Sequence, residues 1–192
     1  MNIAIAHIDH ETINDVKRLA DLTIGKGLVS SDEIFKAVDS NISLILRDET
    51  SGRIIGFSLN EDINMQILSS IYRMCDITFE NFNIEVSSDM IVNNLGALGI
   101  APQYQRQGYG RMIFQAVIDK LKPKADYISA LAWKKDDIIP MQKLLEQAGF
   151  KYFGILKSPY KDVPDISCDY CKSDVCVCDS CLFIWERDIT SL

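Results

Sequence analysis

The sequence LGIAPQYQRQGYGRMIFQAVIDKL, residues 98–121, contains the pattern that decides the fold. Its apolar start predicts a strand that ends near Ile100, and a later apolar stripe of helical period predicts a helix from about Gly110 to Leu121. Gly108 and Gly110 lie at the junction. Glycines there let the chain turn sharply, and the unpaired N–H groups of the next helix favour an anion. The junction is therefore interpreted as an anion site, with a tight structural turn as the alternative.

Two common nucleotide-binding motifs do not fit this junction. The dinucleotide-binding pattern G-x-G-x-x-G needs a third glycine, and that position holds Ile113. A P-loop needs Gly-Lys followed by Ser or Thr, and the sequence contains no such run. Both of these classes are therefore excluded.

The rest of the chain alternates between strand and helix patterns. Strands are expected at residues 2–8, 42–47, 53–59, 92–100, 127–132, 150–156 and 182–187. Helices are expected at residues 12–20, 31–38, 110–121 and 141–148, with a short one near 67–75. This order predicts an α/β (mixed α+β) fold, in which helices cover both faces of a mixed sheet.

Composition and charge narrow the class of protein. The formal net charge of −7 disfavours nucleic acid or an anionic membrane as a partner. The amino-terminal residues lack the basic start of a signal peptide, and the longest uncharged window contains Asn, Gly and Pro, so no membrane span is expected. We therefore expect a cytoplasmic protein whose cysteines are thiols or metal ligands.

Residues 98–121 resemble motif A of the GNAT superfamily of N-acetyltransferases. The shared features are an apolar lead, a Gln/Arg-x-x-Gly-x-Gly/Ala turn and an arginine that opens the helix. In this chain these positions are Leu98, Ile100, Pro102, Gln105, Gly108, Gly110 and Arg111. Residues 144–150, LLEQAGF, resemble the end of motif B. The resemblance implies one domain over residues 1–192, built on a mostly antiparallel sheet of about seven strands, with residues 61–91 as an insertion.

The resemblance also implies acetyl-CoA as the donor of an acetyl group to an amine. The pyrophosphate is expected on the main-chain amides of residues 106–111, and the pantetheine arm along the strand before them. One freed amide of that strand, that of Leu98, is expected to bond the thioester carbonyl as an oxyanion donor. The expected cofactor-binding residues are Leu98, Ile100, Gln105, Arg106, Gln107, Gly108, Gly110 and Arg111.

The sequence departs from the family at its usual acid and base positions. Asn94 occupies the place of a catalytic glutamate found in some members, and is expected at most to position a water. Leu145 and Ile138 occupy the places of a frequent tyrosine and asparagine. Glu85 and Asp89 are candidate bases, against the alternative of a solvated acidic loop. Direct transfer is expected, and a non-catalytic acyl-CoA sensor or a longer-chain acyltransferase are the alternatives.

A separate composition marks residues 157–181, the Cys-rich segment. CDYCKSDVCVCDSC, residues 168–181, contains five cysteines, and paired Cys-x-x-Cys spacing is typical of a structural zinc site. Cys168, Cys171, Cys176 and Cys178 are the preferred ligands, with Cys181 in place of Cys176 as the alternative, and disulfides as a further one. The segment is expected to form an acidic lid at the acceptor site and to favour a cationic acceptor.

Overall fold

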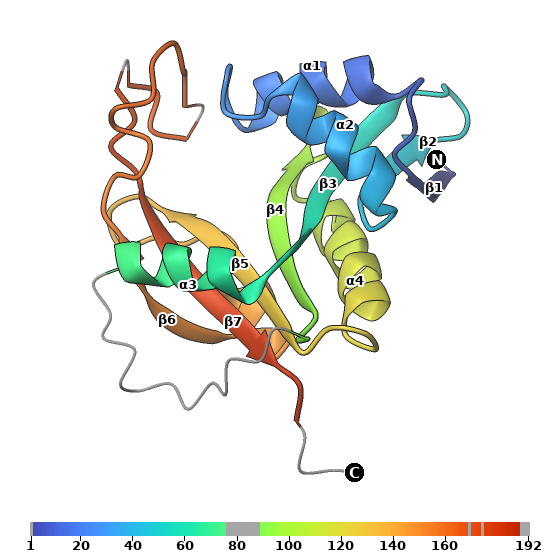
Figure 1. Cartoon of the computed structure of the whole chain (residues 1–192). Coiled ribbons are helices and arrows are strands. Elements are labelled where there is room, and N and C mark those ends of the chain that lie inside the picture. The colour runs from blue at the N-terminus through green and yellow to red at the C-terminus, as the bar shows by residue number, and fades with distance from the viewer. Residues whose placement is uncertain (1, 76–88, 169, 174, 189–192) are drawn as a thin grey trace.

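The computed structural model describes residues 2–75, 89–168, 170–173 and 175–188. Its seven-stranded sheet has the order β1-β2-β3-β4-β5-β7-β6 (Figure 1). All neighbours are antiparallel except β4 and β5, which are parallel. The strands are β1 Ile3–His7, β2 Leu44–Asp48, β3 Ile54–Ile63, β4 Val92–Ile100, β5 Tyr127–Lys134, β6 Lys151–Leu156 and β7 Asp179–Glu186. The predicted mixed, mostly antiparallel sheet is confirmed.

In the described residues, five α-helices cover the two faces of this sheet. They are α1 Ile13–Thr23, α2 Ser31–Ser40, α3 Met65–Met74, α4 Tyr109–Leu121 and α5 Gln142–Gln147. The buried apolar residues of α4 and α5 belong to one core cluster, which includes Leu44 and Leu46 of β2. Ile45, between those two leucines, packs instead with α1 and α2. Because successive strand residues point to opposite faces, α1 and α2 lie opposite α4 and α5.

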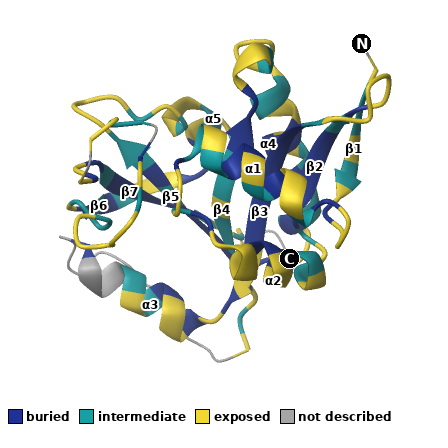
Figure 2. Ribbon diagram, turned by 90° about the horizontal axis from the view of Figure 1, so that it is seen from above, coloured by how far each residue is buried: buried dark blue, intermediate teal, exposed yellow. Residues whose placement is uncertain are grey.

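The other half of the sheet has the same division. Cys181 and Phe183 of β7 face the cluster of α4 and α5, whereas Leu182 and Ile184 pack with Met65 and other residues of α3. Helices α1, α2 and α3 therefore share one face, with α3 in front of β5, β6 and β7 (Figure 1). Burial follows these layers: β2 and β3 are mostly dark, whereas the edge strands β1 and β6 and the outer helix surfaces are more exposed (Figure 2).

Local sequence explains where the helices begin. Ser30 and Glu33 form a reciprocal capping box at the start of α2, in which each side chain bonds the other residue's main-chain N–H. Thr12 is the N-cap residue of α1, but its hydroxyl donates to the carbonyl of Asp9 and makes no bond to the helix. The expected helix start is therefore right, although the Thr12 side chain stabilises the turn at residues 9–12 and not the helix.

One strand runs further than its pattern predicts. Strand β3 continues past Leu59 through Glu61 to Ile63, and only then does α3 begin. Part of the expected insertion at residues 61–91 is thus sheet. Two carboxylates of this segment are expected as candidate bases. Glu85 lies outside the described residues, and Asp89 is described and lies in a turn. In the described part of the chain, every helix is too short or too polar to cross a membrane.

Candidate functional site

The glycine turn, residues 105–111, connects β4 to α4. A short 3-10 helix at Pro102–Tyr104 follows β4, and the side-chain amide of Gln105 then donates to the carbonyl of Ile100 at 2.9 Å. This bond holds the turn against the end of the strand. Arg106 and Gly108 have φ values of 60° and 90°, so the chain reverses through two left-handed residues. Gln107 is fixed in the same way, because its amide donates to the carbonyl of Gln103 at 2.9 Å.

The amino end of α4 opens onto free space. Gly108 is the N-cap residue, and no side chain caps the helix. A Cβ on Gly108 would meet no atom within 4 Å, and one on Gly110 would lie 3.7 Å from a side-chain carbon of Ile100. The first N–H groups of a helix have no partner within it. They therefore point, with the positive end of the helix dipole, into a region that a bound anion can occupy.

Strand β4 parts from β5 after Leu95. The parallel ladder runs from Val92 opposite Tyr127 to Leu95 opposite Ala130 and ends there. Beyond that point β4 stays paired with β3, across an irregularity that places Ser58 opposite Leu98. The two halves of the sheet are thus joined by a short ladder and diverge above it, as the ribbon shows (Figure 1).

The ladder with β3 fixes which amides face the opening. The N–H of Ala101 donates to the carbonyl of Ile55 at 2.8 Å. In an antiparallel pair the direction of the main-chain groups alternates, so Gly99 also faces β3, whereas Leu98 and Ile100 face away from it. The bond from Gln105 to the carbonyl of Ile100 agrees with that direction. The N–H groups of Leu98 and Ile100 therefore point to the side that β5 has left.

Comparison with protein families places the part of the chain that contains these elements. A family model described as "Acetyltransferase (GNAT) family" matches residues 28–150. The chain belongs to the GNAT acetyltransferase family. The matched residues include all of β4, the glycine turn and α4, so the elements that form the candidate site of this GNAT protein lie within them.

Solved structures share the fold over almost the whole chain. The ribosomal-protein-S18-alanine N-acetyltransferase from Escherichia coli has a TM-score of 0.65 and 14% identity, covering 100% of this chain and 99% of the other. NAA60 from Arabidopsis thaliana, solved with a bisubstrate analogue, has a TM-score of 0.67 and 14% identity, covering 96% and 98%. The GNAT-like decarboxylase GphF, solved with isobutyryl-CoA, has a TM-score of 0.67 and 13% identity, and the match covers 95% of this chain and 98% of the other. No curated protein sequence matches this GNAT chain significantly.

Asn94 lies directly below the point where the strands part. Its amide nitrogen donates to a carboxylate oxygen of Glu61 on β3 at 3.0 Å, and its amide oxygen accepts from the hydroxyl of Ser129 on β5 at 3.0 Å. Sequence reasoning found Asn94 but missed Glu61, which lies 33 residues away in the chain. Strand β3 continues for four residues beyond Leu59 and ends with the buried Ile63, but the two exposed residues between them, Glu61 and Asp62, break the period-two pattern that would have revealed it.

The other acid–base positions of the family, Leu145 and Ile138, and the two histidines of the chain are dispersed. Leu145 is buried in the core, at 1% exposure, and Ile138 is exposed in the loop after β5. His7 lies 3.0 Å from the amine of Lys120, and the ring of His10 packs on Phe35. None of these residues lies at the end of the β4–β5 ladder, so none is brought to the candidate site.

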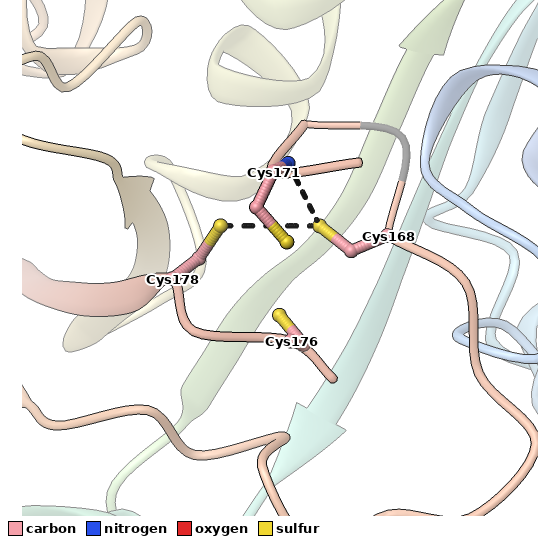
Figure 3. Close-up of side chains that lie close together, drawn as sticks. All are labelled: Cys168, Cys171, Cys176 and Cys178. Carbon is pink, nitrogen blue, oxygen red and sulfur yellow. Dashed lines mark hydrogen bonds between the residues drawn. The ribbon is translucent and has the colours of Figure 1, made fainter. Parts of the chain in front are cut away.

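Four cysteines of the Cys-rich segment converge before β7. The sulfur atoms of Cys168, Cys171, Cys176 and Cys178 all lie within 4.8 Å of one another (Figure 3). Tetrahedral zinc with bonds of about 2.3 Å sets its sulfurs about 3.8 Å apart, and Cys168 and Cys178 are 3.9 Å apart. This cysteine cluster could therefore hold a metal ion. Cys181 lies within β7, paired with Ala132 and Ile155, and belongs to the main core.

The protonation of these thiols depends on their burial. Burial raises the pKa of Cys176 to about 11 and also raises that of Cys178. Burial acts in the same direction on Cys171, but N–H groups directed at its sulfur, from Val177 and Ser173, lower its pKa to about 7. Without a cation, Cys176 and Cys178 are thus neutral thiols. A divalent metal reverses this preference because it binds the thiolate form.

The cysteine cluster is attached to both halves of the molecule. The N–H of Ser167 donates to the carbonyl of Lys26, in the loop between α1 and α2, at 2.9 Å. Gly25 of that loop packs so closely that a Cβ there would lie 2.0 Å from the carbonyl oxygen of Ser167. On the other side, the rings of Tyr170 and Trp133 of β5 stack at 6.1 Å. The segment therefore spans from β5 to the α1–α2 loop, across the region where β4 and β5 diverge.

Proposed function

We propose that this protein is an N-acetyltransferase that moves an acetyl group directly from acetyl-CoA to an amine. The observation that carries the proposal is the parting of β4 from β5 after Leu95, which leaves the N–H groups of Leu98 and Ile100 unpaired by a neighbouring strand. The same strand leads into the uncapped start of α4. A thioester and a diphosphate can therefore bind along one continuous stretch of main chain.

The diphosphate of acetyl-CoA is assigned to the glycine turn. The N–H groups of residues 106–111 would bind its oxygens, and the left-handed Gly108 keeps the approach free of side-chain atoms. Arg111, in the first turn of α4, is exposed, and its guanidinium donates to the side-chain oxygen of Gln147 on α5 at 3.3 Å. Gln105 contributes by fixing the turn to Ile100.

The thioester is assigned to the end of β4. The N–H of Leu98 would donate to the thioester carbonyl, and that of Ile100 to the pantetheine arm. As the amine attacks, the carbonyl oxygen becomes negative, and a donor already held in a sheet needs no reorganisation to stabilise it. A neutral amine forms the new C–N bond and the C–S bond breaks. No acetylated protein side chain is required.

The cysteine cluster is assigned to zinc with a structural role. Cys168, Cys171, Cys176 and Cys178 would supply four thiolates, which close the coordination sphere and leave no position for a substrate. Bound zinc would replace the thiol protons and stabilise the connection between the Cys-rich segment and the α1–α2 loop. This assignment rests on the proximity of the four sulfurs.

A cationic acceptor fits the charge of the Cys-rich segment. Residues 157–181 contain five aspartates and three lysines, and four thiolates carry more charge than one Zn²⁺ neutralises. Asp162 and Asp165 are exposed, whereas Asp179 is paired with Lys157 at 3.2 Å. Asp169 and Asp174 lie outside the described residues. An amine on a basic peptide or a polyamine is the acceptor class that this charge favours.

The alternative function is an acyl-CoA sensor without catalysis. The buried Leu145 and the exposed Ile138, where the family often has acid–base groups, favour it. CoA release in a thiol assay, with spermidine and unblocked basic peptides as acceptors, separates the two functions. We expect acceptor-dependent release with acetyl-CoA and slower release with longer acyl-CoA donors. Tight CoA binding by calorimetry without turnover of any acceptor would favour the sensor, and an acetyl-cysteine trapped on the protein would contradict direct transfer.

A further inference from the structure

A row of three polar side chains crosses the sheet where its halves separate. Glu61, Asn94 and Ser129 occupy paired positions on β3, β4 and β5. The amide nitrogen of Asn94 lies 3.0 Å from a carboxylate oxygen of Glu61, and the Ser129 hydroxyl lies 3.0 Å from its amide oxygen. The next pair along, Leu95 with Ala130, is the last of the β4–β5 ladder. The row therefore forms the base of the divergence.

The row faces the side of the sheet that the Cys-rich segment and the α1–α2 loop approach. Ile128 and Ala130, on either side of Ser129, pack in the cluster of α4 and α5. Ser129 and its row partners must then face the opposite side, which α1, α2 and α3 cover. Ser129 is buried at 1% exposure, whereas Glu61 is exposed at the other end of the row. The row thus leads from the ladder to a solvated carboxylate.

The three side chains have separable roles. An amide nitrogen carries two protons and an amide oxygen only accepts. Because the hydroxyl of Ser129 occupies the oxygen, the nitrogen of Asn94 turns to Glu61 and keeps one N–H for a water. A glutamate in place of Asn94 would put the carboxylate on β4 itself. Here the carboxylate lies one strand away, on β3, and Asn94 orients it.

We propose that Glu61 accepts the proton that the acceptor ammonium must lose before it attacks the thioester. This inference rests on the proposed N-acetyltransferase function. Leu98, the assigned oxyanion donor, is four residues beyond Asn94 on the same strand, at most about 13 Å along it at 3.3 Å per residue. An acceptor amine at the thioester and a water on the second N–H of Asn94 would lie between these two groups. Glu61 is the catalytic residue, and Asn94 and Ser129 are positioning residues.

Protons and electrons balance in this step. One proton passes from the ammonium through water to the carboxylate of Glu61, which later releases it to solvent. The neutral nitrogen forms the C–N bond, and the C–S electron pair leaves with the CoA sulfur. The second proton, lost from the acylated nitrogen, is taken up by that thiolate. The products are the acetylated amine, CoA thiol and one solvent proton.

The chain supplies a matched control on the other face of the same two strands. Asp62 and Asn93 form the next cross-strand pair, and the Asn93 amide donates to the Asp62 carboxylate. Successive strand residues point to opposite faces, so this pair lies on the side of α4 and α5. Asp62→Asn removes the same charge from the same strand without touching the Glu61 row. Both carboxylates are exposed, so neither change removes buried packing.

The test compares steady-state rates of the zinc-loaded protein with acetyl-CoA and spermidine or unblocked basic peptides. We expect Glu61→Gln to lower kcat about 100-fold with an unchanged KM for acetyl-CoA, as loss of a general base does. Glu61→Asp should recover part of this loss, and added formate should restore part of the rate of Glu61→Ala. Asp62→Asn should stay within about twofold of the wild type, because exposed charges contribute little.

The outcomes separate this inference from the function on which it rests. A wild-type rate in Glu61→Gln, or a loss in Asp62→Asn as large as that in Glu61→Gln, would contradict the role of Glu61 alone. Failure of formate to raise the rate of a folded Glu61→Ala protein would also contradict it. If the wild type acetylates none of these acceptors while binding CoA, the proposed function fails and the role of Glu61 fails with it.

Discussion

The glycine turn and the cysteine cluster organise their surroundings in opposite ways. In the glycine turn the proposed ligands are main-chain N–H groups, held in place by two left-handed residues and two amide side chains. In the cysteine cluster they are four side chains within 4.8 Å, and the main chain supplies attachment to Lys26. The first depends on backbone conformation, and the second depends on residue identity. A substitution in the glycine turn should therefore weaken CoA binding by changing the backbone. A substitution in the cysteine cluster should weaken acceptor binding by removing a metal ligand.

The largest effect is expected from Gly108→Glu. The new carboxylate would enter the space that the diphosphate needs, and the backbone at φ 90° favours glycine. We expect the Kd for CoA to rise about 100-fold or more, because charge-assisted bonds are lost and like charges are opposed. Calorimetry on zinc-loaded protein measures it. Gly52→Glu is the control, since Gly52 also has positive φ and open space around its Cβ but lies in the β2–β3 hairpin. Equal losses in both variants would contradict the assignment.

An intermediate effect is expected from loss of the metal. Cys176→Ser removes one proposed ligand, so zinc content should fall. The Cys-rich segment would then lose its fixed position beside the acceptor, and the KM for the acceptor should rise about tenfold, which corresponds to about 1.4 kcal/mol of binding free energy. The Kd for CoA should change by less than about twofold. Metal analysis and steady-state kinetics measure these quantities. Cys75→Ser is the matched control, because Cys75 is buried outside the cluster. Equal weakening of CoA and acceptor would show that the two regions are not independent.

The smallest effect is expected from Gly25→Ala. Its methyl group would overlap the carbonyl of Ser167, so the α1–α2 loop must move away from the Cys-rich segment. We expect a Tm lower by about 3–8 °C, as overpacking costs about 1–3 kcal/mol in a chain of this length. The acceptor KM should rise about threefold while zinc content stays the same. Gly52 also has a positive φ, 72° against 139° for Gly25, but no overlap, so a similar Tm in Gly52→Ala and Gly25→Ala would contradict this coupling.

Much of the fold could be predicted from the sequence, because its strongest patterns are local. The strand expected at residues 92–100 is β4, and the helix expected from about Gly110 begins at Tyr109. The four clustered cysteines lie within eleven residues, so their proximity follows from a short loop. Spacing along the chain is sufficient in each of these cases.

The contacts that could not be predicted join distant residues. Glu61 meets Asn94 only because β3 runs past Leu59 and pairs with β4 in one register across an irregularity. A shift of one residue would turn Glu61 to the other face and bring Asp62 into its place. Ser167 and Lys26 meet through two loops without periodic sequence. Register and loop packing are set by the whole fold, which explains why the candidate base was missed.

The position of β7 has a consequence for how the protein is made. Among the described strands β7 follows β6 in the chain, yet it lies between β5 and β6 and pairs with both. During synthesis, β5 and β6 have no shared neighbour until residues 179–186 leave the ribosome. All four clustered cysteines emerge just before it, so a nascent chain can capture a metal ion ahead of sheet closure. A carboxy-terminal truncation that removes β7 should therefore leave the emerging chain exposed to aggregation and proteolysis.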